Sequence, residues 1–148
     1  MNNTKTPILG FEGEFRFLSN FYLNQIEYKN EKFESVEHAY QAQKATNQAD
    51  FELIQNSFSP YHAKKFAKDV KLREDWEKAK DGIMLDLIRI KFSTSPMKEK
   101  LIETSDSYLE ETNYWGDTYW GVFNDKGKNK LGKILMKVRE ELINKTGL

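Results

Sequence analysis

The 148-residue sequence contains no cysteine and only two histidines. The absence of cysteine excludes disulfides, thiolate metal ligands and a cysteine nucleophile, and it is compatible with a reducing compartment. The two histidines, His38 and His62, do not have the spacing of a metal site. We therefore expect neither a metal ion nor another cofactor.

Long apolar runs and an excess of charge of one sign are also missing. No run approaches the ~18 apolar residues of a membrane span, and the N-terminal residues 1–7 lack the apolar core of a signal peptide. The 23 acidic residues balance the 23 basic ones, so no overall field attracts nucleic acid or anionic lipid. We expect a cytoplasmic protein that does not bind membranes and that contacts nucleic acid only through a local basic patch.

The sequence is rich in aromatic residues and long enough for one core. Aromatic residues make up 14% of the chain, and they can supply both a core and a stacking surface. A length of 148 residues is typical of one domain, and no repeat, linker or low-complexity tract interrupts it. We expect a single compact domain over residues 1–148, with its core over about 8–145.

Apolar periodicity and cap residues predict a mainly α domain (α+β) with a small N-terminal β element. The β element consists of a short strand within 8–18 and a hairpin over 25–33 with Asn30 in its turn. Helices are expected at 35–44, 50–55, from 59 onward, at 73–92, at 95–103 and from 129 or 130 onward. The expected N-caps include Ser35, Ser59 and Ser95, and a last short strand is expected within 107–112.

The segment 35–44 carries the most reactive set of side chains. Ser35 stands where an N-cap belongs, and Glu37 falls in the first turn, where the helix dipole favours negative charge. One helix face carries a carboxylate, an aromatic ring, an amide and an ammonium group, from Glu37, Tyr40, Gln41 and Lys44. Two alanines leave other faces thin enough for close packing, so we expect a substantially buried helix. The alternative is that the polar face is an ordinary solvated surface.

Two later segments also combine residue types that suit a ligand. Residues 113–122 hold four aromatic residues, two Trp-Gly pairs and Asp117, which suits a wall against which a planar base or a sugar stacks. The alternative is that one of the two tryptophans fills a gap over the core. Residues 126–133 form a glycine-containing lysine loop that leads into a helix, and backbone amides at such a helix start bind phosphate. The loop lacks a nucleotide-binding fingerprint, so a solvated basic loop is the alternative.

Several motifs follow one another along the chain. They are Ser19-Asn20-Phe21, the block SVEHAYQAQK from Ser35 to Lys44, Leu72-Arg73-x-x-Trp76, Tyr119-Trp120-Gly121, and Gly127-x-Asn129-x-Leu131-Gly132 followed by Leu135-Met136. In this order the motifs resemble the NADAR, or YbiA-like, family over nearly the whole chain. The resemblance implies a compact, mainly helical fold and N-glycosidase activity on ribosylated nitrogen compounds. The family's substrate classes are ADP-ribose attached to guanine and phosphoribosylamino-pyrimidine intermediates of riboflavin synthesis.

The resemblance also assigns residues one by one. It implies that Glu37 is the family's helix glutamate, and further matches are Asn20, Phe21, Lys44, Trp76 and Asn129. There is one departure. The family's Trp-Gly pair aligns with Trp120-Gly121, and the aspartate that follows the pair is Val122 here. Asp117 matches an acidic residue before the pair, so the resemblance implies that catalysis rests on Glu37 and Asp117.

These assignments predict an enzyme, a metal-independent N-glycoside hydrolase. Cleavage of the C1′–N bond passes through an oxocarbenium-like state, which Glu37 would stabilise while it activates water. The leaving base would gain a proton from Asp117 or Lys44, or a hydrogen-bonding amide would stabilise its developing charge. The expected substrate-binding residues are Asn20, Phe21, Tyr40, Gln41, Lys44, Trp76, Trp120, Lys128 and Asn129.

The first expected substrate is ADP-ribose attached to guanine, either as a small molecule or linked to nucleic acid, and the second is a riboflavin-pathway ribosylamine. A non-catalytic module that binds ADP-ribose or another NAD-derived ligand is a third alternative, because Val122 replaces the family's aspartate.

Overall fold

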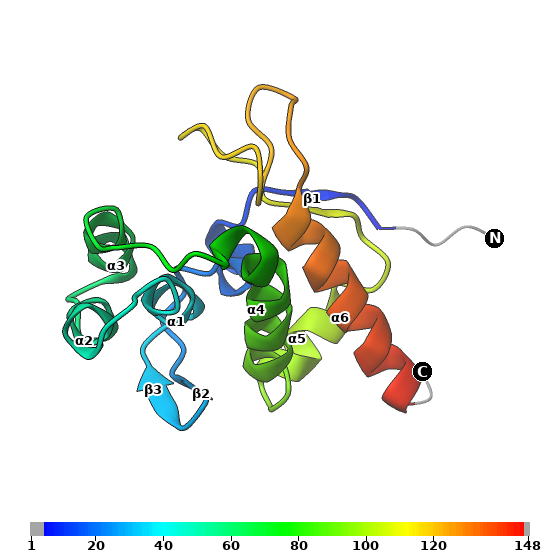
Figure 1. Ribbon diagram of the computed structural model, residues 1–148. Coiled ribbons are helices and arrows are strands. Elements are labelled where there is room, and N and C mark those ends of the chain that lie inside the picture. Colours follow the sequence, from blue (N-terminus) through cyan, green and yellow to red (C-terminus); the bar gives the residue numbers. More distant parts are fainter. Residues whose placement is uncertain (1–4, 147–148) are drawn as a thin grey trace. The chain divides into compact units, whose positions relative to one another are not determined.

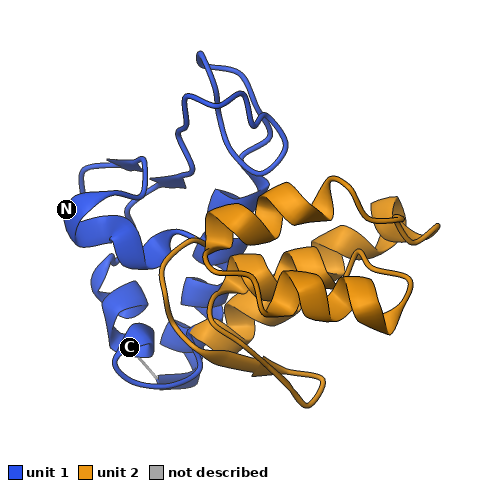
Figure 2. Cartoon of the chain, turned by 90° about the vertical axis from the view of Figure 1, so that its left-hand side faces the viewer, with its two compact units in different colours: residues 1–19, 92–148 blue, residues 20–91 orange. Residues whose placement is uncertain are grey.

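The computed structural model describes residues 5–146. The first four residues, which belong to the segment where no signal peptide is expected, and residues 147–148 lie outside the described residues. The chain divides into two compact units (Figure 2). Unit 1 combines Met1–Ser19 with Phe92–Leu148, and unit 2 is the continuous segment Asn20–Lys91. The prediction of a single domain stays a prediction.

Unit 2 begins with a hairpin of β2 (Ile26–Tyr28) and β3 (Glu31–Phe33), which pair antiparallel. The two turn residues, Lys29 and Asn30, both have positive φ, as a tight hairpin turn requires. The predicted hairpin and its turn are therefore confirmed. The Tyr28 hydroxyl donates to Asp86 at 3.1 Å, and burial together with this carboxylate raises the pKa of Tyr28 to about 12.

Four helices complete the described part of unit 2 (Figure 1): α1 (Val36–Ala42), α2 (Gln48–Gln55), α3 (Pro60–Ala67) and α4 (Trp76–Lys91). The hydroxyls of Ser35 and Ser59 accept hydrogen bonds at the starts of α1 and α3, so both predicted N-caps are confirmed. Helix α1 packs against α2, α3 and α4, which places it at the centre of this unit.

Unit 1 joins segments from both ends of the chain. Strand β1 (Ile8–Leu9) pairs in parallel with β4 (Leu109–Glu110). A 3₁₀ helix, η1 (Gly13–Leu18), follows β1, and α5 (Met97–Glu103) packs against the long α6 (Lys130–Thr146). Its core includes the buried side chains of Phe11, Leu18, Phe92, Leu101, Leu109 and Leu135. The described part of the chain is thus mainly helical with small β elements, as predicted.

Several predicted boundaries are wrong, each for a local reason. The strand expected within 8–18 stops at Leu9, because Gly10 and Gly13 adopt positive φ and the aromatic residues that follow join η1. Ser95 does not cap α5, since its hydroxyl donates to the carboxylate of Glu99 and the helix has no side-chain cap. The strand expected within 107–112 shrinks to two residues.

Two helices differ from the prediction at their starts. Helix α2 begins at Gln48, two residues early, because the side chain of Asn47 accepts from the amide of Asp50 and caps it. Helix α4 begins at Trp76 rather than at Arg73, which is held in an ion pair described below.

Within residues 5–146, no helix is long and apolar enough to cross a membrane. The same residues hold no group of three or more His, Asp or Glu side chains that could hold a metal ion.

Candidate functional site

Helix α1 is buried on every face. All seven of its residues are buried, including the polar residues Glu37, His38 and Gln41. Packing by α2, α3 and α4 explains this burial, because three neighbouring helices leave little of such a short helix in contact with water. The predicted burial of the segment is confirmed, and the alternative of a solvated polar face is wrong.

The carboxylate of Glu37 lies among buried amides. Glu37 is 7% exposed, and its Oε2 accepts a hydrogen bond of 2.7 Å from the side-chain amide of Gln41, one turn later in α1. The backbone amide of Glu37 donates to the backbone carbonyl of Asn20 at 3.1 Å. The loop that carries Asn20 is therefore fixed against the first turn of α1.

Two buried oxygens, on the two residues just named as hydrogen-bonded to Glu37, have no hydrogen-bond partner within the described part of the chain. They are Oε1 of Gln41 and Oδ1 of Asn20, on side chains that are 5% and 7% exposed. The other end of the Asn20 amide makes only a long contact of 3.5 Å with the sulfur of Met84. A buried acceptor without a donor costs about 1–3 kcal/mol. Such groups are uncommon in folded proteins and point to a ligand that supplies donors.

Lys44 extends the same set of polar groups past the end of α1. Its ammonium nitrogen lies 5.8 Å from the ring centroid of Tyr40 and 5.6 Å from that of Trp76. The two rings contact each other with their centroids 5.1 Å apart, and Trp76 is only 4% exposed. The rings thus hold the cation by cation–π attraction and shield it from water.

Burial lowers the pKa of Lys44 below its ordinary value, because an ammonium group loses hydration in this position. The negative charge of Glu37 opposes this and raises the pKa, while the nearby Lys64, Lys68 and Lys80 lower it further. Lys44 is therefore a stronger acid than an exposed lysine. It can bind an anion or give up a proton.

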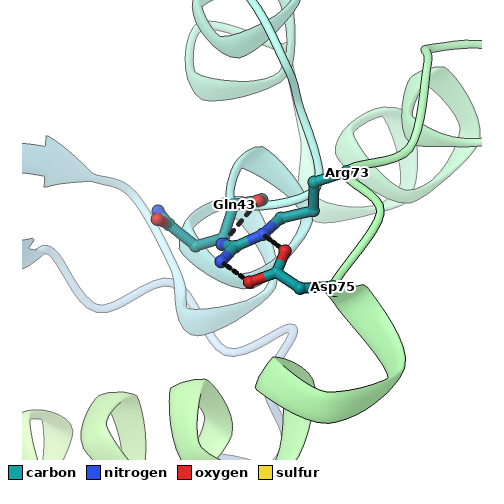
Figure 3. A network of polar contacts seen from close by, with 3 residues as sticks. All are labelled: Gln43, Arg73 and Asp75. Atoms are coloured by element: carbon teal, nitrogen blue, oxygen red, sulfur yellow. Dashed lines mark hydrogen bonds and ion pairs between the residues drawn. The ribbon is translucent and has the colours of Figure 1, made fainter.

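An ion pair fixes the end of α1, and sequence reasoning did not assign it a role (Figure 3). Arg73 binds the carboxylate of Asp75 through two nitrogens at 2.6 and 2.7 Å, and its third nitrogen donates to the carbonyl of Gln43 at 3.4 Å. The backbone amide of Arg73 also donates to the carbonyl of Lys44 at 3.0 Å. The hydrogen bond to Asp75 raises the pKa of Arg73, and the same bond lowers that of Asp75. The signal in the sequence was Arg73 within the Leu72-Arg73-x-x-Trp76 motif.

His38 is a structural residue of the same helix. Its ring nitrogens lie 2.8 Å from the hydroxyl of Ser35 and 3.1 Å from the carbonyl oxygen of Ser57, so both nitrogens have partners when the ring is neutral. Burial lowers the pKa of His38, which keeps the ring neutral.

The other predicted site residues belong to unit 1, where a Trp-Gly loop occupies residues 113–121. Asp117 is half-buried, and its Oδ1 accepts hydrogen bonds from the backbone amides of Tyr119 and Trp120 at 3.0 and 2.9 Å. The side chain of Asn113 binds both the amide and the carbonyl of Asp117. The Oδ1 atom of Asp117 therefore stabilises the turn that leads to Trp120.

Neither tryptophan of this loop is deeply buried. Trp115 is exposed, so it does not fill a gap over the core. Trp120 is half-buried, so it meets this alternative only in part. Their rings contact the adjacent tyrosines edge to face, with centroids 5.1 and 4.9 Å apart.

Asn129 is also engaged by the backbone. The residue is buried, its Oδ1 accepts from the amide of Glu111 at 3.0 Å, and its Nδ2 donates to the carbonyl of Leu109 at 3.0 Å and to the hydroxyl of Tyr108 at 3.2 Å. Nearby, a Cβ at Gly132 would lie 2.1 Å from the carbonyl oxygen of Leu109. The late Gly-x-Asn-x-Leu-Gly motif thus fastens the start of α6 to β4.

Four consecutive backbone amides at the start of α6 are already engaged. The amides of residues 128–131 donate to the carbonyls of Thr118, Gly121, Tyr119 and Trp120. The expectation that these amides bind phosphate is therefore wrong, because the Trp-Gly loop already occupies them. Lys128 is exposed, and its ammonium nitrogen lies 5.3 Å from the ring centroid of Tyr119. A phosphate role for this residue rests on its side chain alone.

The structure thus divides the predicted site residues between the two units. Unit 2 holds Asn20, Phe21, Glu37, Tyr40, Gln41, Lys44 and Trp76, and unit 1 holds Asp117, Trp120, Lys128 and Asn129. Of the first set, Phe21 is half-buried.

Comparison with known proteins agrees with this assignment of motifs. Residues 10–143 match the NADAR domain. An N-glycosidase of Nostoc punctiforme is 38% identical over 133 residues, which cover 85% of each chain. A riboflavin biosynthesis protein of Vibrio vulnificus is 33% identical over 147 residues, which are 95% of this chain but only 40% of that protein.

The fold has a solved counterpart as well. The NMR structure of YbiA from Escherichia coli, a protein named as an N-glycosidase, superposes with a TM-score of 0.85 at 31% identity and covers 99% of this chain and 89% of that one. The match over most of the sequence and the shared fold confirm the resemblance, and the chain belongs to the NADAR domain family.

Proposed function

We propose that this chain hydrolyses the C1′–N bond of a ribosylated nitrogen compound at the centre formed by Glu37, Gln41, Asn20 and Lys44. The observation that carries the proposal is the pair of buried, unpartnered acceptors on Asn20 and Gln41, the two residues that hydrogen-bond to Glu37. Ribose hydroxyls are donors of the kind these oxygens lack. An N-glycosidase is the enzyme class that the family and the named relatives support.

Glu37 would act on the sugar carbon. As the C1′–N bond breaks, positive charge develops at C1′ and the ring oxygen, and a carboxylate held in a buried position stabilises that charge strongly. The amide of Gln41 orients this carboxylate through its 2.7 Å hydrogen bond. Water then adds to C1′ and loses its proton to the carboxylate, which leaves a free hydroxyl on the ribose.

Lys44 would act on the leaving nitrogen or on a phosphate. Its pKa, which burial lowers, makes the ammonium group a ready proton donor to the departing base. Asp117 remains a proposed second carboxylate, and it would act through Oδ2 because Oδ1 holds the turn. Trp120, Lys128 and Asn129 stay predicted binding residues on the family resemblance, with Asn129 given a structural role by its own contacts.

ADP-ribose attached to guanine is the substrate that we propose first. The lysines that lower the pKa of Lys44 give this part of unit 2 a positive potential that suits a diphosphate. The second candidate is a phosphoribosylamino-pyrimidine, which the riboflavin name of the Vibrio relative favours. Action without a metal or other cofactor and a cytoplasmic location complete the proposal.

The test is product release by the purified protein and by Glu37→Gln. ADP-ribosylated guanine and a phosphoribosylamino-pyrimidine are offered separately, and the free base or amine is measured by chromatography. Removing the charge while keeping the shape should slow turnover by about a hundredfold or more, with ligand affinity largely retained. Glu27→Gln, at an exposed glutamate of β2, is the matched control.

Turnover by Glu37→Gln at the parent rate would show that the catalytic group lies elsewhere. Binding of ADP-ribose without release of any product from either substrate would favour the alternative of a non-catalytic binding module.

A further inference from the structure

Phe58 has a position that the fold does not explain. It stands immediately before Ser59, the N-cap of α3, and its side chain is 93% exposed. An apolar residue at this position commonly packs on the fourth residue of the helix, which here is Ala63. Ala63 is fully buried, whereas Phe58 leaves its ring in water. Exposure of an apolar ring to water is unfavourable in free energy, and a binding partner that covers the ring would remove this penalty.

Two more rings stand beside Phe58. Tyr61 is 60% exposed, and the ring of His62 lies 5.9 Å from that of Phe58 and 5.6 Å from that of Tyr61, edge to face in both pairs. His62 is itself fixed by the hydroxyl of Ser59 at 2.7 Å. The half-buried ring of His62 thus holds the exposed rings of Phe58 and Tyr61 in place. The exposed parts of these two rings remain accessible to a planar partner.

The same helix face is basic. Tyr61 is followed on that face by residues three, four and seven positions later, which are Lys64, Lys65 and Lys68. No acidic residue occurs from 53 to 68, although the whole chain carries no net charge. Three positive charges therefore concentrate beside the rings, and they form a local patch in a neutral protein.

We propose that this α3 surface, made of Phe58, Tyr61, Lys64, Lys65 and Lys68, binds single-stranded nucleic acid. Exposed rings bind unpaired bases by stacking, and lysines along one helix face bind the phosphates that connect them. An apolar protein partner would use the rings but gain nothing from three lysines. A single-stranded nucleic acid accounts for both features, because its bases stack on the rings and its phosphates complement the charge of the lysines.

The position of the surface gives the binding a consequence. Helix α3 packs directly against α1, and the charges of Lys64 and Lys68 reach Lys44 strongly enough to lower its pKa. A strand held by these lysines runs beside the Lys44 end of α1. If the function proposed above is correct, the surface would present a nucleotide of the strand to that centre. The binding itself does not depend on catalysis.

The test uses fluorescence anisotropy of a labelled oligothymidylate of about twelve nucleotides, a length suited to small stacking surfaces. We expect Phe58→Ala with Tyr61→Ala to weaken binding by about fivefold or more, since each stacked base is lost. Leu23→Ala, at another exposed apolar residue of unit 2, is the control and should change nothing.

The lysines are tested through salt. Lys65→Gln with Lys68→Gln should reduce the slope of log affinity against log salt by about 1.4, since each phosphate contact of a single strand contributes about 0.7. Lys32→Gln with Lys78→Gln removes the same charge from exposed lysines elsewhere in unit 2 and should leave the slope close to that of the parent. A duplex of the same length should bind more weakly, because its bases are already stacked.

Several results would overturn the inference. They are absence of oligonucleotide binding at low salt, equal binding by the aromatic double variant and the parent, and a lysine effect no larger than that of its control. Self-association that is lost in Phe58→Ala, or Phe58-dependent binding to phosphatidylserine vesicles in place of the oligonucleotide, would assign the surface to another partner. Turnover of a free ADP-ribosyl nucleoside should be unchanged in the aromatic variant, which separates failure of this surface from failure of the proposed activity.

Discussion

Helix α1 and the Trp-Gly loop hold comparable sets of polar residues, yet they use them in opposite ways. In the loop, Oδ1 of Asp117 accepts two backbone amides, and in the motif that follows the loop the side-chain amide of Asn129 bonds to the backbone of Glu111 and Leu109. Around α1, Asn20 and Gln41 bury acceptors that no group in the described part of the chain satisfies. The motifs shared with the family therefore have two different roles. One motif encodes the fold, and the other encodes a centre whose full hydrogen bonding requires a ligand.

The largest effect that separates the two regions should come from Lys44→Met, which keeps an unbranched, flexible side chain and removes its charge. If Lys44 protonates the leaving base, turnover should fall by about a hundredfold or more. The parent should also lose activity as pH rises past the lowered pKa of Lys44, since only the ammonium form donates, and this alkaline limb should lie below the ordinary lysine range. A pH profile of kcat checks both points, with Lys78→Met as an exposed control. An alkaline limb that persists in Lys44→Met would assign it to another group.

Two asparagines offer the sharpest contrast in stability. Asn129→Leu removes three hydrogen bonds and leaves the amide of the half-buried Glu111 and the carbonyl of the buried Leu109 without that partner, so the unfolding free energy should fall by about 3 kcal/mol. Asn20→Leu removes an acceptor that has no partner, so it should leave the unfolding free energy unchanged or raise it by about 1 kcal/mol. Urea unfolding measures both, and product release should be weakened in Asn20→Leu despite its stability. Equal destabilisation by the two variants would remove the distinction.

A smaller effect should come from His38, the satisfied polar residue within α1. Its pKa is lower in the folded than in the unfolded state, so the unfolded chain binds more protons as pH falls. The stability from the neutral ring is fully present above a pH of about 6.5 and is lost as pH falls through the lower folded pKa, at no more than about 1.4 kcal/mol per pH unit. Urea unfolding of the parent and of His38→Gln at several pH values should show a shallower slope in the variant. Identical slopes would contradict a lowered pKa.

The smallest effect on stability is expected from Asp117→Asn. Asparagine keeps the oxygen that accepts from Tyr119 and Trp120, so the unfolding free energy should change by less than about 0.5 kcal/mol. Turnover measures the other oxygen, Oδ2. A loss as large as that of Glu37→Gln is expected if Oδ2 is the second carboxylate proposed above, and turnover near that of the parent would remove Asp117 from the catalytic residues.

Local rules predicted a large share of the fold. Ser35 and Ser59 act as caps, and the turn at Asn30 forms, because these features depend on neighbours within a few residues. Ser95 failed where a competing local partner, Glu99, took its hydroxyl. Helix α4 starts one residue after the ion pair of Arg73 with Asp75, which sequence spacing alone did not reveal.

The candidate site was harder to predict, because its properties depend on contacts between distant segments. The face shared by Glu37 and Gln41 was expected, but its burial depends on three other helices. The amides at the start of α6 were expected to be free for phosphate, and carbonyls about ten residues earlier in the chain occupy them. Which polar atoms are satisfied is a tertiary property, and the distinction between α1 and the Trp-Gly loop rests on it.

The pairing of β1 with β4 has a consequence for the order of folding during synthesis. Residues 8 and 109 are partners in this pair, so unit 1 cannot close until about three quarters of the chain has been made. Unit 2 is one continuous segment, and every residue of its hairpin and four helices is available once Lys91 has left the ribosome. Because domains fold as units when their residues emerge, the α1 centre can form while the N-terminal segment that belongs to unit 1 still waits for its partner strand.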